Sequence, residues 1–254
     1  MKALKSALAL VLLMLLFCVN TSANTHIPIL LSHNVLESYP VEDSIVTVTP
    51  QLFEEHVTSL VNAGYTPISF DEYLSAANGT GTLPAKPVII TFDDGYETNY
   101  TYAFPVLKKH NVKATIFAAV KYMGETPGEH KHFTWEQARE MQQSGLVSIQ
   151  SHTYGHENML PLDAFAAERE IRYSKYLMEK NLGVPCNVLA FPYGFHTDEL
   201  IARAKNAGYD LTVQVGNYGQ NTLDYSGKSL VRITVYGSWS GNMLLHNMSA
   251  FRNR

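Results

Sequence analysis

Cysteine is scarce in this chain, which has only Cys18 and Cys186 among its 254 residues. Cys18 lies in an apolar N-terminal stretch that we expect to be removed, and this would leave Cys186 alone. An exported chain with one cysteine has no internal disulfide, so a small disulfide-stapled domain is excluded. Stability must come from an ordinary hydrophobic core. With 46% hydrophobic residues, the chain has ample material for one such domain.

Basic charge is also in short supply. The chain has 19 lysines and arginines against 23 acidic residues, and its formal net charge is -4. This mild acidity argues against nucleic acid or strongly anionic partners. Beyond the N-terminal stretch, no apolar run is long enough to cross a membrane.

The N-terminal stretch has the parts of a secretory signal peptide. Two lysines precede an apolar run over residues 7–19, and small residues then lead to Ala23. We predict a signal peptide over residues 1–23 and a single catalytic domain over residues 24–254. An uncleaved anchor is the less favoured alternative, because the apolar run is short and lacks a basic stop behind it. The protein is therefore expected to be exported, to a periplasm, the cell surface or the medium.

Two adjacent carboxylates follow a short apolar run at the centre of the sequence. The run Val88–Phe92 reads as a buried strand, and Asp93, Asp94 and Gly95 come directly after it. Two carboxylates this close repel each other in a sheltered site, and a metal cation would relieve that repulsion by binding one and leaving the other free as a base. The alternative is a simple Asp-Gly turn after a strand.

A pair of histidines follows a second strand-like run. His152 and His156 come after Val147–Ser151 and are four positions apart, which puts both rings on one side of a helical turn. Imidazole together with carboxylate suits zinc and similar divalent metals. One aspartate with two histidines leaves an open coordination position, as a catalytic metal requires. The alternative is a pair of surface histidines in a loop.

These segments resemble the motifs of the polysaccharide deacetylases, carbohydrate esterase family four. Thr91–Gly95 and Ser151–His156 are similar to the first and second motifs of that family, and Ala190–Gly194 is similar to the third. The similarity extends over nearly the whole chain after residue 23. Three motifs in the family's order and spacing make the resemblance specific.

The resemblance implies a role for each motif residue. Asp94, His152 and His156 would hold a divalent metal, with zinc expected and cobalt or nickel as alternatives. Asp93 would act as the base that takes a proton from the attacking water. The main-chain N–H of Tyr193 would face the developing oxyanion.

The catalytic histidine of this family has two candidates. Leu31-Ser32-His33 resembles an early strand that carries this histidine in the exported poly-N-acetylglucosamine deacetylases, although serine stands where tyrosine is usual. His33 is therefore the expected general acid. His246 superficially resembles the C-terminal histidine of other branches, but it falls in a helix-like segment beyond the last predicted strand.

The third motif departs from the family at one position. Ala190 stands where an arginine usually orients the catalytic aspartate. We expect Arg169 or Arg172, on the charged face of a helix over residues 162–181, to replace it. His130 and His132 fall in a loop over residues 123–131 and just after it, and we interpret them as solvated histidines.

Strands alternate with helices about seven times along the chain. This pattern predicts an α/β fold, a (β/α) barrel with the candidate site residues at strand ends. The resemblance implies the distorted (β/α)7 form of that barrel. The resemblance implies metal-dependent removal of N-acetyl groups from an N-acetylglucosamine polysaccharide. The position of His33 and the export signal make poly-β-1,6-N-acetylglucosamine the first choice. Peptidoglycan, chitin oligomers and xylan are alternative substrates. A non-catalytic carbohydrate-binding relic of the fold and a metallohydrolase of non-sugar amides are alternative functions.

Overall fold

The structure is a computed structural model that describes residues 26–216, 219–225 and 227–252. The predicted signal peptide, residues 1–23, lies outside the described residues. Among the described residues, no helix combines the length and the apolar character that crossing a membrane would take.

Seven parallel strands of the described chain close into a barrel. Their order around the barrel is β1-β10-β9-β8-β7-β6-β5, and pairing of β1 with β5 closes the ring. The predicted seven-stranded (β/α) barrel is therefore confirmed. The strands are β1 (Ile29–Ser32), β5 (Pro87–Phe92), β6 (Ala114–Ala118), β7 (Val147–Ser151), β8 (Val188–Ala190), β9 (Leu211–Val215) and β10 (Leu230–Thr234).

Three short strands lie beside this ring. The first residues of β5 pair with β4 (Thr66–Pro67), outside the closed barrel. A separate parallel pair joins β2 (Asn34–Val35) to β3 (Thr47–Val48), just after β1 in the chain. This pair fixes the segment that follows His33, because the His33 N–H donates to the Val46 carbonyl.

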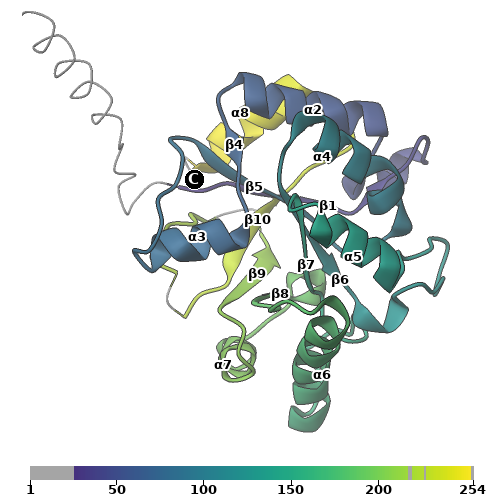
Figure 1. Ribbon diagram of the computed structural model, residues 1–254, viewed down its shortest axis with the longest axis vertical. Helices are drawn as coiled ribbons and strands as arrows, with labels where there is room; N and C mark the ends of the chain where they lie inside the picture. The colour runs from purple at the N-terminus through teal and green to yellow at the C-terminus, as the bar shows by residue number, and fades with distance from the viewer. Residues whose placement is uncertain (1–25, 217–218, 226, 253–254) are drawn as a thin grey trace, which may run out of the picture.

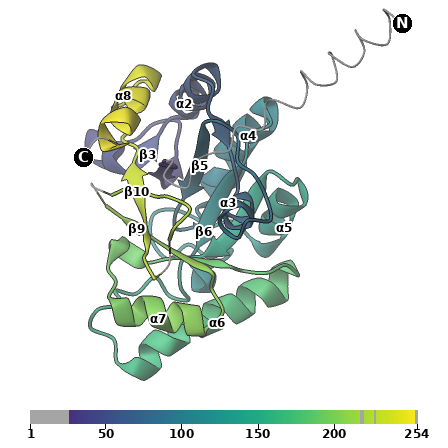
Figure 2. The same ribbon diagram turned by 90° about the vertical axis from the view of Figure 1, so that its left-hand side faces the viewer.

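Helices surround the barrel (Figures 1 and 2). The terminal helix α8 packs beside α2, and both lie on the opposite side of the molecule from α6 and α7. The α-helices are α2 (Pro50–Asn62), α3 (Phe70–Ala77), α4 (Phe104–His110), α5 (Trp135–Gln143), α6 (Ala164–Leu182), α7 (Asp198–Asn206) and α8 (Gly241–Arg252). Single helical turns are η1 (Val41–Ile45), η2 (Asn99–Ala103), η3 (Val120–Tyr122) and η4 (Pro192–Gly194).

Alternation along each strand divides the core into two layers. On β5, Ile90 and Phe92 pack outward against the surrounding helices, whereas Ile89 belongs to a cluster that fills the barrel with residues such as Phe117 and Val213. Because successive side chains point to opposite faces, Thr91 and Asp93 continue the inward row started by Ile89. The barrel is thus a packed apolar core with polar side chains at the carboxyl ends of its strands.

Candidate active site

The two aspartates reach one site because the chain turns sharply after β5. Asp93 is buried at the end of the inward row of β5, whereas Asp94 adopts a left-handed backbone with φ of 70°. Gly95 follows with φ of 84°, and a Cβ atom there would lie 2.8 Å from the Cβ of Ala118. This backbone turns Asp94 out of the strand's alternation, so that both carboxylates face the histidines after β7.

Arg232 is the partner of Asp93. It comes from β10, is completely buried, and donates from its two terminal nitrogens to the two carboxylate oxygens at 2.6 and 2.7 Å. Burial by itself would raise the pKa of Asp93, but the Arg232 guanidinium, with smaller help from His152 and His33, lowers that pKa below its usual value. Asp93 is therefore held ionised and fixed in orientation.

The expectation that Arg169 or Arg172 would orient the aspartate is wrong. Both lie exposed on α6, where Arg172 pairs with Glu168 and Arg169 lies 4.0 Å from Glu170. The sequence did carry a signal for the correct residue: Arg232 is a single charge in the apolar run of β10, and alternation places it in the same layer as Leu230. A charge buried in a barrel strand needs an ionic partner inside the barrel.

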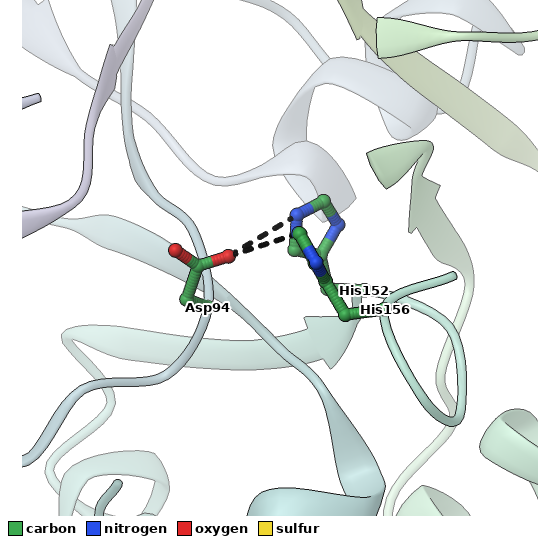
Figure 3. A group of neighbouring side chains, drawn as sticks. All are labelled: Asp94, His152 and His156. Carbon is green, nitrogen blue, oxygen red and sulfur yellow. Dashed lines mark ion pairs between the residues drawn. The ribbon is translucent and has the colours of Figure 1, made fainter. Parts of the chain in front are cut away.

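The predicted metal ligands come together. One ligand atom each from Asp94, His152 and His156 lies within 4.8 Å of the others. Oδ1 of Asp94 is 3.2 Å from Nε2 of His156 and 3.6 Å from Nε2 of His152. Dashed lines in Figure 3 mark these two ion pairs. The same Oδ1 atom is buried and accepts no hydrogen bond from the described residues. An acceptor without a hydrogen bond, facing two imidazole nitrogens, suits a divalent cation.

A hydrogen bond fixes the His152 ring for this task. Nδ1 of His152 donates to the carbonyl oxygen of Ala190 at 2.8 Å, which leaves the Nε2 lone pair directed at the aspartates. Burial lowers the pKa of His152 to about 4. For Asp94, burial would raise the pKa, but its direct contact with His156, together with the charges of His33 and His152, lowers it. A neutral imidazole and an ionised carboxylate are the forms that bind metal.

The loop that carries both histidines is strained and held from outside. Thr153 and His156 adopt left-handed backbones with φ of 67° and 57°. The buried carboxylate of Glu170, on α6, accepts the Gly155 N–H at 2.6 Å, and the Glu170 carbonyl accepts the Tyr154 N–H at 3.1 Å. Such backbone strain persists only where neighbours enforce it, so Glu170 acts as the clamp of this loop.

His33 lies at the site, whereas His246 does not. His33 directly follows β1, is half-buried, and is close enough to Asp93 and Asp94 for its charge to lower the pKa of both. Its Nδ1 atom is buried and has no hydrogen-bond partner among the described residues. His246 is exposed on α8. The role of His33 as general acid stays a prediction.

The third motif crosses the site as the turn η4. Tyr193 has φ of 60°, and its exposed ring lies 4.8 Å from the ring of His156. Gly194 next to it could not carry a Cβ atom, which would lie 2.9 Å from the Val215 nitrogen. The backbone here is therefore closely constrained. That its N–H meets an oxyanion stays a prediction.

The interpretation of His132 as a solvated loop histidine is wrong. Only 5% of it is exposed, and its ring packs between Tyr96 and Tyr122 beside the candidate metal ligands. An isolated β-bridge joins His132 to Tyr96, just after the Asp-Asp-Gly turn. This pairing was not visible in the local sequence, which is rich in Gly, Pro and charge.

Comparison with known proteins decides the family. The profile described as polysaccharide deacetylase matches residues 80–212, which include the strands and turns carrying Asp93, Asp94, His152, His156 and Tyr193. The chain belongs to the polysaccharide deacetylase family. As a member of carbohydrate esterase family four it is a polysaccharide N-deacetylase, a hydrolase.

Relatives of this deacetylase support the assignment over most of its length. It is 31% identical to YxkH of Bacillus subtilis (strain 168), whose name describes it only provisionally as a polysaccharide deacetylase, over 88% of this chain and 76% of YxkH. It is 30% identical to the poly-beta-1,6-N-acetyl-D-glucosamine N-deacetylase of Escherichia coli (strain K12), over 76% of this chain but only 34% of that protein.

A solved structure carries the same fold. The Streptococcus pyogenes deacetylase PplD, in complex with acetate, superposes with a TM-score of 0.80 at 29% identity. The match covers 89% of this deacetylase and 99% of PplD. The barrel and its site thus account for nearly all of that relative's solved chain.

Proposed function

We propose that this deacetylase removes N-acetyl groups from poly-β-1,6-N-acetylglucosamine outside the cytoplasm. The observation that carries the chemistry is the pair Asp93–Arg232 set beside the triad Asp94, His152 and His156. The choice of substrate is supported by His33 at the end of β1 and by relatives from Escherichia coli and Staphylococcus epidermidis, 30% and 28% identical, that are named for this polymer.

Asp94, His152 and His156 would hold the metal, for which zinc is our proposal. A bound divalent cation would supply Lewis-acid polarisation of the acetyl carbonyl and lower the pKa of water at the site. The chemistry of the ligand set favours zinc, since two imidazoles and one carboxylate are donors that zinc takes in catalytic sites.

The protein's own groups then handle the protons. Asp93, kept ionised by Arg232, accepts the proton of the attacking water. The Tyr193 N–H donates to the oxyanion of the tetrahedral intermediate. His33 gives a proton to the departing amine, so the amide C–N bond breaks to leave acetate and a free glucosamine. Asp93 follows β5 and His33 follows β1, and both lie at the same site. The proposed base and the proposed acid can therefore act in one turnover.

The proposed site of action outside the cytoplasm is supported by the N-terminal sequence. We propose that residues 1–23 direct export and are removed. Fractionation of cells that produce the full chain, with N-terminal sequencing of the product, tests this proposal. A new N-terminus at residue 24 outside the cytoplasm supports it. Retention of Met1 in a cytoplasmic or membrane fraction contradicts it.

Acetate release tests the proposed reaction. Purified protein is incubated with β-1,6-linked N-acetylglucosamine oligomers, with chitin oligomers of equal length, with peptidoglycan and with acetylated xylan. The reactions are run before and after chelation, and metal content is measured by elemental analysis. The variant Asp93→Asn removes the proposed base, and Asp71→Asn, an exposed aspartate of α3, is its control.

Release from the β-1,6 oligomers that is abolished by chelation and by Asp93→Asn, but kept in Asp71→Asn, is the expected result. Preference for another acetylated polymer would keep the mechanism and replace the substrate. Bound metal without release from any of the four substrates would point to a carbohydrate-binding role.

A further inference from the structure

A walled pocket of about 260 Å³ opens beside the metal ligands. Asp94 and His156 form part of its inner wall. Four ring-bearing residues, Tyr96, Tyr122, His130 and His132, also line it. Ala119 and the loop residues Pro127, Gly128 and Glu129 complete the lining. Nothing in the mechanism above uses these four rings. A set of aromatic surfaces next to a catalytic centre is the usual lining of a ligand pocket.

The rings hold one another in place. His132 lies 5.0 Å from Tyr96 and 5.5 Å from Tyr122, measured between ring centroids. His130 packs edge-on against Tyr96 at 5.5 Å with an interplanar angle of 79°. Edge-to-face packing of this kind fixes ring orientation. The wall is therefore formed before any ligand arrives, which lowers the entropic cost of binding.

The backbone fixes the same wall to the catalytic turn. The Phe133 N–H donates to the Gly95 carbonyl at 3.0 Å, and the Glu97 N–H donates to the Lys131 carbonyl at 2.8 Å. The Lys131 ammonium also pairs with Glu97 at 2.9 Å. Gly95 and Glu97 are part of the segment that begins with Asp93. Any sugar held by the wall is therefore held in a fixed position relative to the catalytic aspartates.

The lining also shows which part of a substrate fits there. Asp93, His33 and Tyr193 do not line the pocket, although all three belong to the proposed reaction. The reacting acetamido group must lie between those residues and the metal ligands, and so it does not occupy this pocket. The volume lies just below the roughly 300 Å³ at which small-ligand sites begin, so the pocket has room for one ring and not for a stretch of polymer.

We propose that this pocket is a subsite for the sugar unit next to the one that loses its acetyl group. This inference rests on the proposed function, because it presumes a sugar polymer as substrate. The apolar C–H faces of a pyranose pack on aromatic rings, while its hydroxyls bond to imidazole, phenol and carboxylate groups such as that of Glu129 at the loop tip. The subsite makes the deacetylase act on oligomers in preference to isolated acetyl compounds.

The variant His130→Ala tests the subsite, because His130 is only half-buried at the loop tip and its removal leaves the backbone bonds intact. Thr126→Ala, on the same loop but outside the lining, is the matched control. Two substrates are compared, a β-1,6-linked N-acetylglucosamine tetramer and an aryl acetate that carries no sugar. We expect His130→Ala to raise KM for the tetramer about tenfold. The ratio of kcat/KM for the tetramer to kcat/KM for the aryl acetate should fall by the same factor. Thr126→Ala should leave that ratio at the wild-type value.

An equal loss on both substrates would overturn the proposal, because His130 would then act on the metal chemistry. An unchanged ratio would also overturn it. A second measurement is independent of turnover: calorimetric titration of metal-free protein with the tetramer, in which His130→Ala should weaken binding by a similar factor. If the wild type hydrolyses the aryl acetate but no sugar, the proposed function fails, and this titration alone decides the subsite. Loss of binding in His130→Ala would then support the subsite, and equal binding would refute it.

Discussion

Arg232 of β10 holds both carboxylate oxygens of Asp93, the residue that follows β5, although the two are 139 positions apart in the chain. Both side chains are buried inside the barrel, and the guanidinium lies 5.2 Å above the Phe117 ring. The β1 strand separates β5 from β10 in the ring of strands. The ion pair therefore joins, inside the barrel, two strands that do not pair with each other, and it ties the proposed base to β10.

Replacing Arg232 by methionine should damage both stability and turnover. The change leaves the Asp93 carboxylate buried without its partner, and loss of one member of a buried ion pair typically costs about 3–5 kcal/mol. Turnover should fall about 100-fold or more, because the proposed base loses its fixed orientation. Urea unfolding and acetate release measure the two effects. The double variant Arg232→Met with Asp93→Asn should be more stable than Arg232→Met alone. If it is less stable, the two side chains do not act as a pair.

Glu170→Ala should weaken metal binding without touching a metal ligand. The Glu170 carboxylate holds the Gly155 N–H, one residue before His156, and removal of such a supporting hydrogen bond typically costs about 10–100-fold in metal affinity. Competition with a chromogenic chelator measures that affinity. Glu168→Ala, a carboxylate on the outer part of the same helix, should behave as wild type. If Glu170→Ala binds the metal with the same affinity as the wild type, the histidine loop keeps its conformation without the Glu170 carboxylate.

The metal-free protein should lose stability as the pH falls through the weakly acid range. Burial lowers the folded-state pKa of His152 from 6.5 to about 4. At a pH between these two pKa values, His152 binds a proton in the unfolded chain but not in the folded chain. The free energy of unfolding therefore decreases as the pH decreases, and His152 contributes roughly 3 kcal/mol to this decrease. Burial also lowers the pKa of His56, which adds to the loss of stability at acid pH. Asp94 raises the pKa of His156, which opposes that loss.

Urea unfolding in the presence of chelator, at a series of pH values between about 4 and about 7, measures this dependence. His152→Asn should show a flatter profile than the wild type. A wild-type free energy of unfolding that rises toward acid pH would contradict the assignment of a buried, neutral His152.

Gly95→Ala should cost more stability than Gly145→Ala, although both glycines have a left-handed backbone. Gly145, with φ of 72°, has open space around its Cβ position, so alanine there adds only the backbone strain of about 1 kcal/mol. At Gly95, with φ of 84°, the new Cβ atom would also lie 2.8 Å from Ala118. Only Gly95→Ala should displace Asp94 and reduce metal binding. Equal effects of the two changes on thermal unfolding and on metal affinity would refute this reading of the turn.

Cys186 should resist alkylation in the folded protein. Burial raises the pKa of its thiol to about 12, and the thiolate is the reactive form. Peptide mass spectrometry after iodoacetamide treatment should find Cys186 unmodified under native conditions and modified in urea. Rapid modification of the native protein would mean that the start of β8 opens readily.

The sequence by itself determined the features that depend on short-range spacing. An apolar run followed by Asp93 and Asp94, and a second run followed by His152 and His156, were enough to predict strands and a turn, because alternation and strand-end position are local properties. The same residues indicated a metal site, and the resemblance of the motifs assigned its ligands. The repeating order of strands and helices likewise predicted a (β/α) barrel, and the resemblance of the motifs supplied its seven-stranded form.

Only the tertiary structure decided which distant side chains meet. The pairing of Arg232 with Asp93 depends on closure of the barrel. The hydrogen bond from Gly155 to Glu170 depends on how α6 packs against the histidine loop. The burial of His132 depends on its bridge to Tyr96. The sequence marked Arg232 as unusual, but the helical arginines Arg169 and Arg172 were equally plausible partners from composition alone. The physical reason is that a buried charge requires a partner without specifying which one, and the choice is made by the packing of elements that are remote in sequence.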